Sequence, residues 1–207
     1  MRFDLAELPP DLGYKLLTST ITPRPIAWVS TLGATGVVNV APYSFFNAMG
    51  HTPPVVALGL LRDSNRGFKD TARNILDSGE FVVNLVPEGM IAQMSATSAA
   101  LPPEESELEA AGLRAAPSTH IRPPRLADSP VSFECVTHAA VVTGPQQTIV
   151  IGRVLAVHVA DHFVLDAEKG YIDTPALGLV ARMHGAGWYA RSTDLFQLAR
   201  PKTGSGV

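Results

Sequence analysis

Short runs of branched and aromatic residues, separated by glycine and proline, recur along the chain and predict β-strands. The clearest pair covers 26–31 and 37–41, and a turn containing Gly33 and Gly36 joins the two runs into a predicted β-hairpin. A polar and aromatic loop is expected after this hairpin, ending at Pro53 and Pro54. Further strands are expected at 55–61, 80–87, 131–142, 148–160 and 162–165. This succession predicts a mainly β fold, a Greek-key β-barrel with appended helices.

The helical patterns are few and short. Asp70 is the expected cap of a helix that starts at Thr71 and ends at Gly79, with Phe68 packing just outside it. Other helices are expected at 89–97 and 104–111, the last an acidic helix stopped by Gly112 in an irregular surface segment, 98–130. The segment 12–20 is either a short helix or a lead-in segment leaning on the barrel. The chain therefore divides into a lead-in segment (1–20), one barrel domain (21–199) and a disordered tail (200–207).

Composition narrows the possible partners. With 207 residues, 46% of them hydrophobic, the chain can form one core and leave some apolar surface for a subunit interface. A formal charge of -3 without a cluster of basic residues gives no electrostatic basis for binding nucleic acid or an anionic membrane. Arg2 and Asp4 interrupt any signal-peptide pattern, and no apolar run approaches the roughly 20 residues of a membrane span. We expect a soluble, cytoplasmic protein.

The cysteine and the histidines do not indicate a catalytic thiol or a metal site. Cys135 is the single cysteine and lies in a predicted strand, where a buried, inert thiol is favoured over a nucleophile. His138, His158 and His162 lack the paired spacing of metal ligands, so surface or structural roles are favoured.

The segment 41–47 combines small, hydroxylated, aromatic and amide residues directly after a strand. Small side chains let a ligand approach the backbone, and the neighbouring polar and aromatic groups suit a flat aromatic ligand with polar edges. The groups concerned are Ser30, Thr31, Asn39, Tyr43, Ser44, Phe45 and Phe46. The alternative is an ordinary barrel corner with its aromatic side chains in the core.

A second candidate lies at the start of the helix near residue 70. Arg66 and Lys69 precede a helix N-terminus, where free N–H groups and the helix dipole favour an anion. A monophosphate fits this pattern better than a dinucleotide, because the chain has neither a phosphate-binding P-loop motif nor a G-x-G-x-x-G motif. A solvated basic loop is the alternative.

Two further segments carry arginines that packing alone does not require. In 182–191, RMHGAGWYAR, two glycines permit close backbone approach beside His184 and Trp188, although an interface or barrel-closing strand would have the same composition. Arg24, in the string PRP, is either an anion contact or a solvated turn residue.

Several longer strings occur in a fixed order: PRPIAWVST, G-x-x-N-x-APYSFFN, PP, KDTARNI and EFVVN. Together they resemble the flavin reductase-like family of FMN-binding split barrels, over 21–191. The resemblance implies a homodimeric split barrel with FMN near the interface. It also implies that Ser30, Thr31, Ala41, Pro42, Tyr43 and Ser44 contact the isoalloxazine or ribityl groups, and that Arg66, Lys69, Asp70 and Thr71 lie at the phosphate. Arg24 and His184 are further candidate contacts.

The implied activity is hydride transfer from NADH or NADPH to FMN, for which no acid/base pair is required. A flavin-dependent monooxygenase is one expected recipient of the reduced flavin. The alternatives are an electron carrier resembling flavoredoxin and a barrel that binds flavin without redox turnover.

Overall fold

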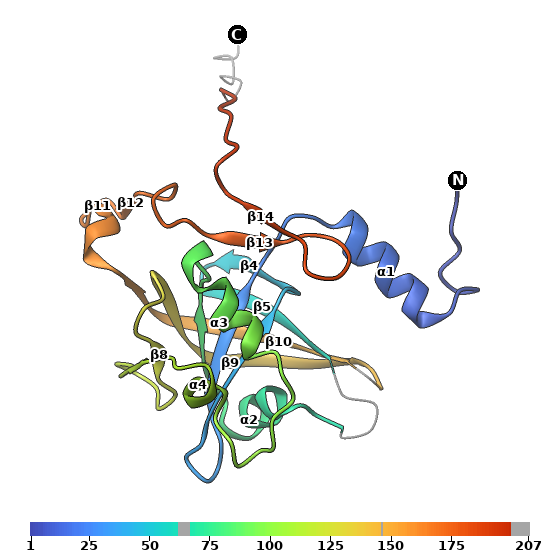
Figure 1. Ribbon diagram of the computed structural model, residues 1–207, viewed down its shortest axis with the longest axis horizontal. Helices are drawn as coiled ribbons and strands as arrows, with labels where there is room; N and C mark the ends of the chain where they lie inside the picture. Colours follow the sequence, from blue (N-terminus) through green and yellow to red (C-terminus); the bar gives the residue numbers. More distant parts are fainter. Residues whose placement is uncertain (62–66, 146, 200–207) are drawn as a thin grey trace.

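A seven-stranded antiparallel sheet forms the centre of the molecule in the computed structural model, which describes residues 1–61, 67–145 and 147–199 (Figure 1). The strands are β3, β2, β6, β9, β10, β5 and β4 in spatial order. In that order their bounds are Val38–Tyr43, Ala27–Leu32, Glu80–Asn84, Val131–Gly144, Gln147–Val159, Pro54–Leu61 and Phe46–His51. The predicted hairpin is confirmed, since β2 pairs with β3 from Ala27↔Tyr43 to Leu32↔Val38.

The sheet closes on itself because β3 and β4, at its opposite edges, are separated in the chain by only Ser44 and Phe45. The Gly59 N–H donates to the Phe45 carbonyl at 2.7 Å, which links β5 to the connection between the two edge strands. A Cβ on Gly59 would lie 2.8 Å from the Phe45 Cβ, so this close approach requires glycine. The prediction of a loop from Ala41 onwards is therefore wrong in its length, because most of 42–51 lies in strands that pair with β2 and β5.

Strand β2 is buried on both faces. Ala27 and Val29 belong to a cluster that includes Leu58, Phe81 and the α2 residue Ile75. Ile26 and Trp28 belong to a second cluster, which contains Val40, Met90, Met94, Leu126 and Val180. Because both sets of alternating side chains are covered, β2 reads as a continuous apolar run rather than as an alternating strand. The segment 98–130 contributes Leu113, Ile121 and Leu126 to the buried residues, so its prediction as a surface excursion holds only in part.

In the described part of the chain, four α-helices accompany the barrel: α1 (Pro10–Thr20), α2 (Asp70–Ser78), α3 (Ile91–Ala96) and α4 (Glu107–Ala110). Single turns of 3₁₀-helix lie at Glu88–Met90 and Asp161–Phe163. Gly79 ends α2 in the left-handed conformation, φ 74°, as predicted. The predicted cap is wrong by one residue, because Asp70 is helical and Lys69 holds the cap position without a side-chain hydrogen bond. The acidic helix is shorter than predicted, because it begins after Ser106, whose hydroxyl donates to the Val38 carbonyl on β3.

Among the described residues, three small sheets complete the fold. They are β1 (Arg24–Pro25) with β13 (Val180–Arg182) and β14 (Tyr189–Arg191), β7 (Ala115–Ala116) with β8 (Arg125–Leu126), and β11 (Val164–Asp166) with β12 (Tyr171–Ile172). Residues 192–199, after β14, extend away from the barrel (Figure 1). The predicted disordered tail, 200–207, lies outside the described residues. No helix in the described part of the chain is both long enough and apolar enough to cross a membrane.

Candidate functional site

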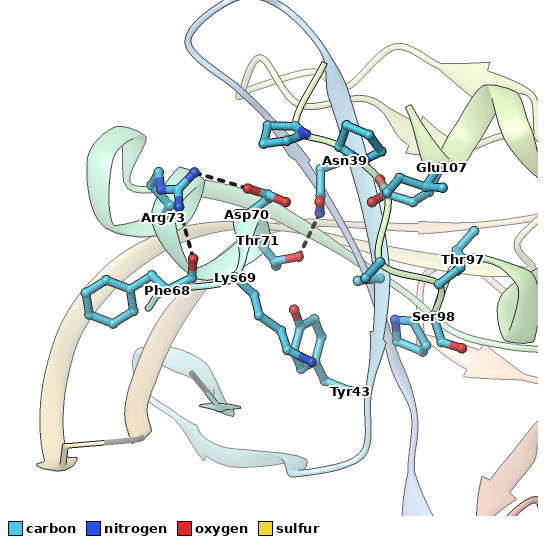
Figure 2. A pocket seen from close by; sticks show the side chains of 17 residues that line it. Asn39, Tyr43, Phe68, Lys69, Asp70, Thr71, Arg73, Thr97, Ser98 and Glu107 are labelled. Atoms are coloured by element: carbon cyan, nitrogen blue, oxygen red, sulfur yellow. Dashed lines mark hydrogen bonds and ion pairs between the residues drawn. The ribbon is translucent and has the colours of Figure 1, made fainter. Parts of the chain in front are cut away.

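Two hydrogen bonds from asparagine side chains fix the start of α2 against the barrel. The Asn74 amide donates to the Thr31 hydroxyl on β2 at 3.0 Å. The Asn39 amide on β3 donates to the Thr71 hydroxyl at 2.7 Å (Figure 2). Thr31 and Thr71 are both almost completely buried. The N-terminal end of α2 is therefore held beside the end of β3.

A cavity of about 440 Å³ opens at this junction, and we call it the Lys69 cavity. Its walls come from the end of β3, the start of α2, the strap 97–103 and α4 (Figure 2). The lining residues are Asn39, Ala41, Pro42, Tyr43, Phe68, Lys69, Asp70, Thr71, Arg73, Thr97, Ser98, Ala99, Ala100, Leu101, Pro102, Pro103 and Glu107. The cavity volume lies in the usual range for small-molecule and cofactor sites.

The α2 end of this cavity offers hydrogen-bond donors to an anion, although the Asp70 carboxylate lies there too. No side chain caps the first N–H groups of α2, so these groups can donate hydrogen bonds to an anion. Arg73 is already paired, because it donates to the Asp70 carboxylate and to the Phe68 carbonyl, each at 3.1 Å. Lys69 is exposed and forms no ion pair with any other described residue. Among the described residues at this end of the cavity, its ammonium group is therefore the cation available to a ligand.

Two further ionisable side chains line the cavity, Tyr43 on β3 and Glu107 on α4. Burial raises the pKa of Tyr43 to about 12, against an opposing hydrogen bond with Thr71, so its hydroxyl stays neutral and can donate a hydrogen bond. Burial also raises the pKa of Glu107, although its carboxylate accepts a hydrogen bond from the Val40 N–H at 3.1 Å. Glu107 thereby ties α4 to the edge of β3 and closes one side of the cavity.

A second, wider cavity of about 990 Å³ adjoins the first, and we call it the Arg182 cavity. Pro42, Tyr43 and Ser98 line both cavities. The remaining walls come from α1, β1, Ser44, α3 and the β13–β14 hairpin. Their residues are Asp11, Tyr14, Lys15, Thr18, Ser19, Arg24, Ile26, Ser44, Ile91, Ala92, Met94, Ser95, Arg182, Gly185, Ala186, Gly187 and Tyr189.

Arg24 holds the walls of the Arg182 cavity together. Its guanidinium donates to the carbonyls of Thr18 and Ile21 at 2.6 and 2.7 Å, and to the Met183 carbonyl at 2.7 Å. A weaker contact of 3.4 Å reaches the Ser44 hydroxyl. Arg24 is only 7% exposed, so it is not the solvated turn residue that the sequence left open. It connects α1, the hairpin and the connection between β3 and β4.

The structure brings most of the predicted site residues together. Ala41, Pro42, Tyr43, Lys69, Asp70 and Thr71 all line the Lys69 cavity, whereas Arg24 and Ser44 line the adjoining one. Arg66 lies outside the described residues. Their assignment as cofactor contacts stays a prediction.

Three predicted contacts lie outside both cavities as the structure describes them. Ser30 is completely buried, and its hydroxyl donates to the Pro124 carbonyl at 2.6 Å. The Thr31 hydroxyl is occupied by Asn74, so both side chains are committed to protein partners. His184 is exposed and stacks on Trp188, with ring centroids 6.0 Å apart, in the hairpin beside the Arg182 cavity.

Sequence reasoning did not find the strap 97–103 or Glu107 as parts of the site. From the sequence, the irregular segment 98–130 could cover a ligand pocket, cover a partner subunit or serve as a plain connection, and its proline pairs did not distinguish these uses. From the sequence, Glu107 could not be distinguished from the other carboxylates of an acidic surface helix. Its burial depends on contact with β3 and not on its neighbours in the chain.

Cys135 and His158 have structural surroundings in the fold. Cys135 is buried and free, as predicted, and burial raises the pKa of its thiol to about 12. His158 forms a 2.5 Å hydrogen bond with buried Glu134. Among the described residues, no group of three or more His, Cys, Asp or Glu side chains is arranged to hold a metal ion.

Comparison with known proteins identifies the family. The model of the flavin reductase like domain matches residues 19–174. An uncharacterized protein of Deinococcus radiodurans is 43% identical over 96% of this chain and 88% of its own. The crystal structure of nitrilotriacetate monooxygenase component B from Bacillus cereus is 37% identical, with a TM-score of 0.89 over 96% of this chain and 98% of that one. That of the 2-nitrobenzoate 2-nitroreductase of Pseudomonas fluorescens is 32% identical, with a TM-score of 0.88 over 98% of both chains. The split-barrel fold is thus confirmed, and the chain belongs to the flavin reductase like domain family.

Proposed function

We propose that this flavin oxidoreductase of the family is an NADH- or NADPH-dependent FMN reductase whose FMN lies in the Lys69 cavity. One observation carries the proposal: the end of β3, Ala41 to Tyr43, and the start of α2, Lys69 to Thr71, line the same cavity. The sequence assigned the ring of FMN to the first of these segments and its phosphate to the second. A ligand with an anionic tail and a flat polar-edged ring requires both to be within reach of one molecule.

The residues present fit the two ends of FMN. Lys69 and the uncapped N–H groups of α2 supply charge-assisted hydrogen bonds for a phosphate. On the β3 side of the cavity, the aromatic ring of Tyr43 can pack on an apolar face of the flavin, while its hydroxyl contacts Thr71 at the start of α2. The strap 97–103 covers the cavity and would exclude water from a bound ring.

Bound flavin would supply the redox chemistry, accepting a hydride at N5 from NADH or NADPH and a proton from solvent, to leave NAD(P)⁺ and reduced FMN. The chain's own residues then have positioning roles. Tyr43, Ser98 and Pro42 separate the two cavities, so they would set the distance between the flavin and a second reactant. The similarity to component B of a monooxygenase supports delivery of the reduced flavin to a separate oxygenase.

The proposal is tested with the purified full chain. Its visible absorption spectrum is recorded, and NADH or NADPH is then added with and without FMN. We expect oxidation of one nicotinamide nucleotide that depends on FMN. A yellow protein that is reduced only through another redox protein would point to an electron carrier instead. Absence of any flavin affinity would contradict the proposal.

We also propose that the protein is a homodimer. The segment after β14 extends from the barrel, and Leu195, Phe196 and Leu198 are 65, 93 and 85% exposed (Figure 1). Three large apolar side chains on an extended segment are typical of an arm that packs on a second copy. Size-exclusion chromatography with light scattering should give twice the chain mass, and deletion after Asp194 should weaken the dimer. A monomeric full chain at micromolar concentration would contradict this.

A further inference from the structure

The Arg182 cavity carries an excess of positive charge. Its described lining contains the basic residues Lys15, Arg24 and Arg182 and one acidic residue, Asp11. Elsewhere on the surface arginines pair with carboxylates, as Arg191 does with Glu88. None of the three basic side chains of this cavity forms an ion pair with another described residue. Their charge is therefore uncompensated, which favours an anionic ligand.

The two arginines differ in how many donors remain available. A guanidinium has five N–H groups. Arg24 directs four of them to Thr18, Ile21, Met183 and Ser44, so it has little left for a ligand. Arg182 is half-buried and uses two, one to the Tyr189 hydroxyl at 3.0 Å and one to the Gly185 carbonyl at 2.7 Å. Three N–H groups of Arg182 have no partner among the described residues, so Arg182 can bind an anion.

The same contacts fix the Arg182 side chain in place. Its guanidinium lies 5.0 Å from the centroid of the Tyr189 ring, which packs against its face. The Gly185 carbonyl and the Tyr189 hydroxyl come from the hairpin that Arg182 itself begins. A guanidinium held in this way loses little side-chain entropy when it binds a planar anion in a bidentate manner.

The rest of the cavity is apolar or aromatic. Ile26, Ile91 and Met94 line one part, and Tyr14 and Tyr43 line another. Inorganic phosphate or a fully hydrated ion would leave these surfaces exposed to water. An organic anion with a flat apolar body would cover them and direct its charge to Arg182.

We infer that the Arg182 cavity is a binding site for an aromatic carboxylate, with Arg182 as its principal ligand and Lys15 as a second cation. The site shares Tyr43 and Pro42 with the Lys69 cavity, so its occupant would lie next to the flavin. The role of this cavity as the site of a second reactant rests on the proposed function. Its preference for an anion depends only on its own residues.

Benzoate and benzamide test the inference, because they have the same flat body and differ in charge. Each is titrated into the full chain by ligand-observed NMR, with and without saturating FMN. We expect benzoate to bind at least tenfold more tightly than benzamide. Arg182→Gln should abolish this preference. Arg153→Gln, which removes a positive charge from exposed β10 surface outside both cavities, should leave it unchanged.

Lys15→Gln provides a variant that does not touch the hairpin. Lys15 is exposed on α1, and its replacement should reduce the preference for benzoate at least threefold even if Arg182→Gln fails to fold. Equal binding of benzoate and benzamide, or equal losses in the Arg182 and Arg153 variants, would overturn the inference. The inference would also be overturned if the binding of adenosine monophosphate depended on Arg182 while the binding of benzoate did not. Benzoate binding without any FMN binding would contradict the proposed function alone, and FMN binding without benzoate binding would contradict this inference alone.

Discussion

Replacement of Lys69 by alanine should weaken FMN binding about ten- to thirtyfold and change riboflavin binding less than about twofold. Lys69 lies at the start of α2, where it forms no ion pair with a described carboxylate. A charge-assisted hydrogen bond to phosphate contributes about 1.5–3 kcal/mol, and the exposure of Lys69 places it in the lower part of that range. Riboflavin lacks the phosphate, so it should be nearly indifferent to the change. Fluorescence titration of both flavins measures the two affinities.

A matched control separates this local effect from a change in net charge. Arg153→Ala removes one positive charge from an exposed position on β10, outside both cavities, and should leave both flavins unaffected. Equal losses for FMN and riboflavin in the Lys69 variant would place the phosphate elsewhere. An effect of the same size in the Arg153 variant would attribute it to long-range electrostatics.

Glu134→Gln should lower the free energy of unfolding by about 2–4 kcal/mol near pH 7, because it disrupts a buried carboxylate with charge-assisted bonds. Glu134 is completely buried on β9. Its carboxylate accepts the backbone N–H groups of Thr119 and His120 at 2.6 and 2.7 Å, and it contacts His158 at 2.5 Å. Glutamine offers one oxygen for these donors, and its amide group would face the other N–H. Urea unfolding followed by circular dichroism measures the difference.

The pH dependence of this effect has a definite sign. Burial by itself would raise the pKa of Glu134, but the N–H donors of Thr119 and His120 and the contact with His158 hold that pKa below its ordinary value of 4.5. The folded state therefore binds the proton less readily than the unfolded state. The stabilisation is complete above pH 4.5 and is lost as the pH falls below it through the folded pKa. The difference between wild type and Glu134→Gln should narrow over that acidic range.

Exposed Glu168 supplies the control for the acid measurements. Glu168→Gln changes the same charge without removing a buried contact, so its unfolding free energy should follow the wild type at every pH. A constant difference between wild type and Glu134→Gln from pH 7 to pH 3 would contradict the linkage described above.

The elements that depend on neighbouring residues were predictable from the sequence. The β2–β3 hairpin follows from alternating branched residues around Gly33 and Gly36, and the end of α2 follows from Gly79, which adopts φ 74°. Cys135 was correctly placed in the interior because a lone cysteine in an apolar strand gains most from burial. The ordered motifs from PRPIAWVST to EFVVN identified the family, and with it the split barrel.

The details of the site depended on contacts between distant segments. Ser30 and Thr31 read as available hydroxyls, but Pro124 and Asn74 occupy them. Arg24 was predicted as a solvated turn residue or an anion contact; it is buried and donates to three carbonyl groups, and its contact with an anion stays a prediction.

What the sequence by itself determined is the strands of the central sheet other than β4, the family, and the two segments that carry the ring and phosphate predictions. Only the tertiary structure decided that these segments line one cavity, that the strap 97–103 covers it, and that a second cavity around Arg182 adjoins it. The physical reason is that strand and turn preferences act over a few residues. The position of a donor relative to its acceptor is set instead by packing between parts of the chain that are far apart in sequence.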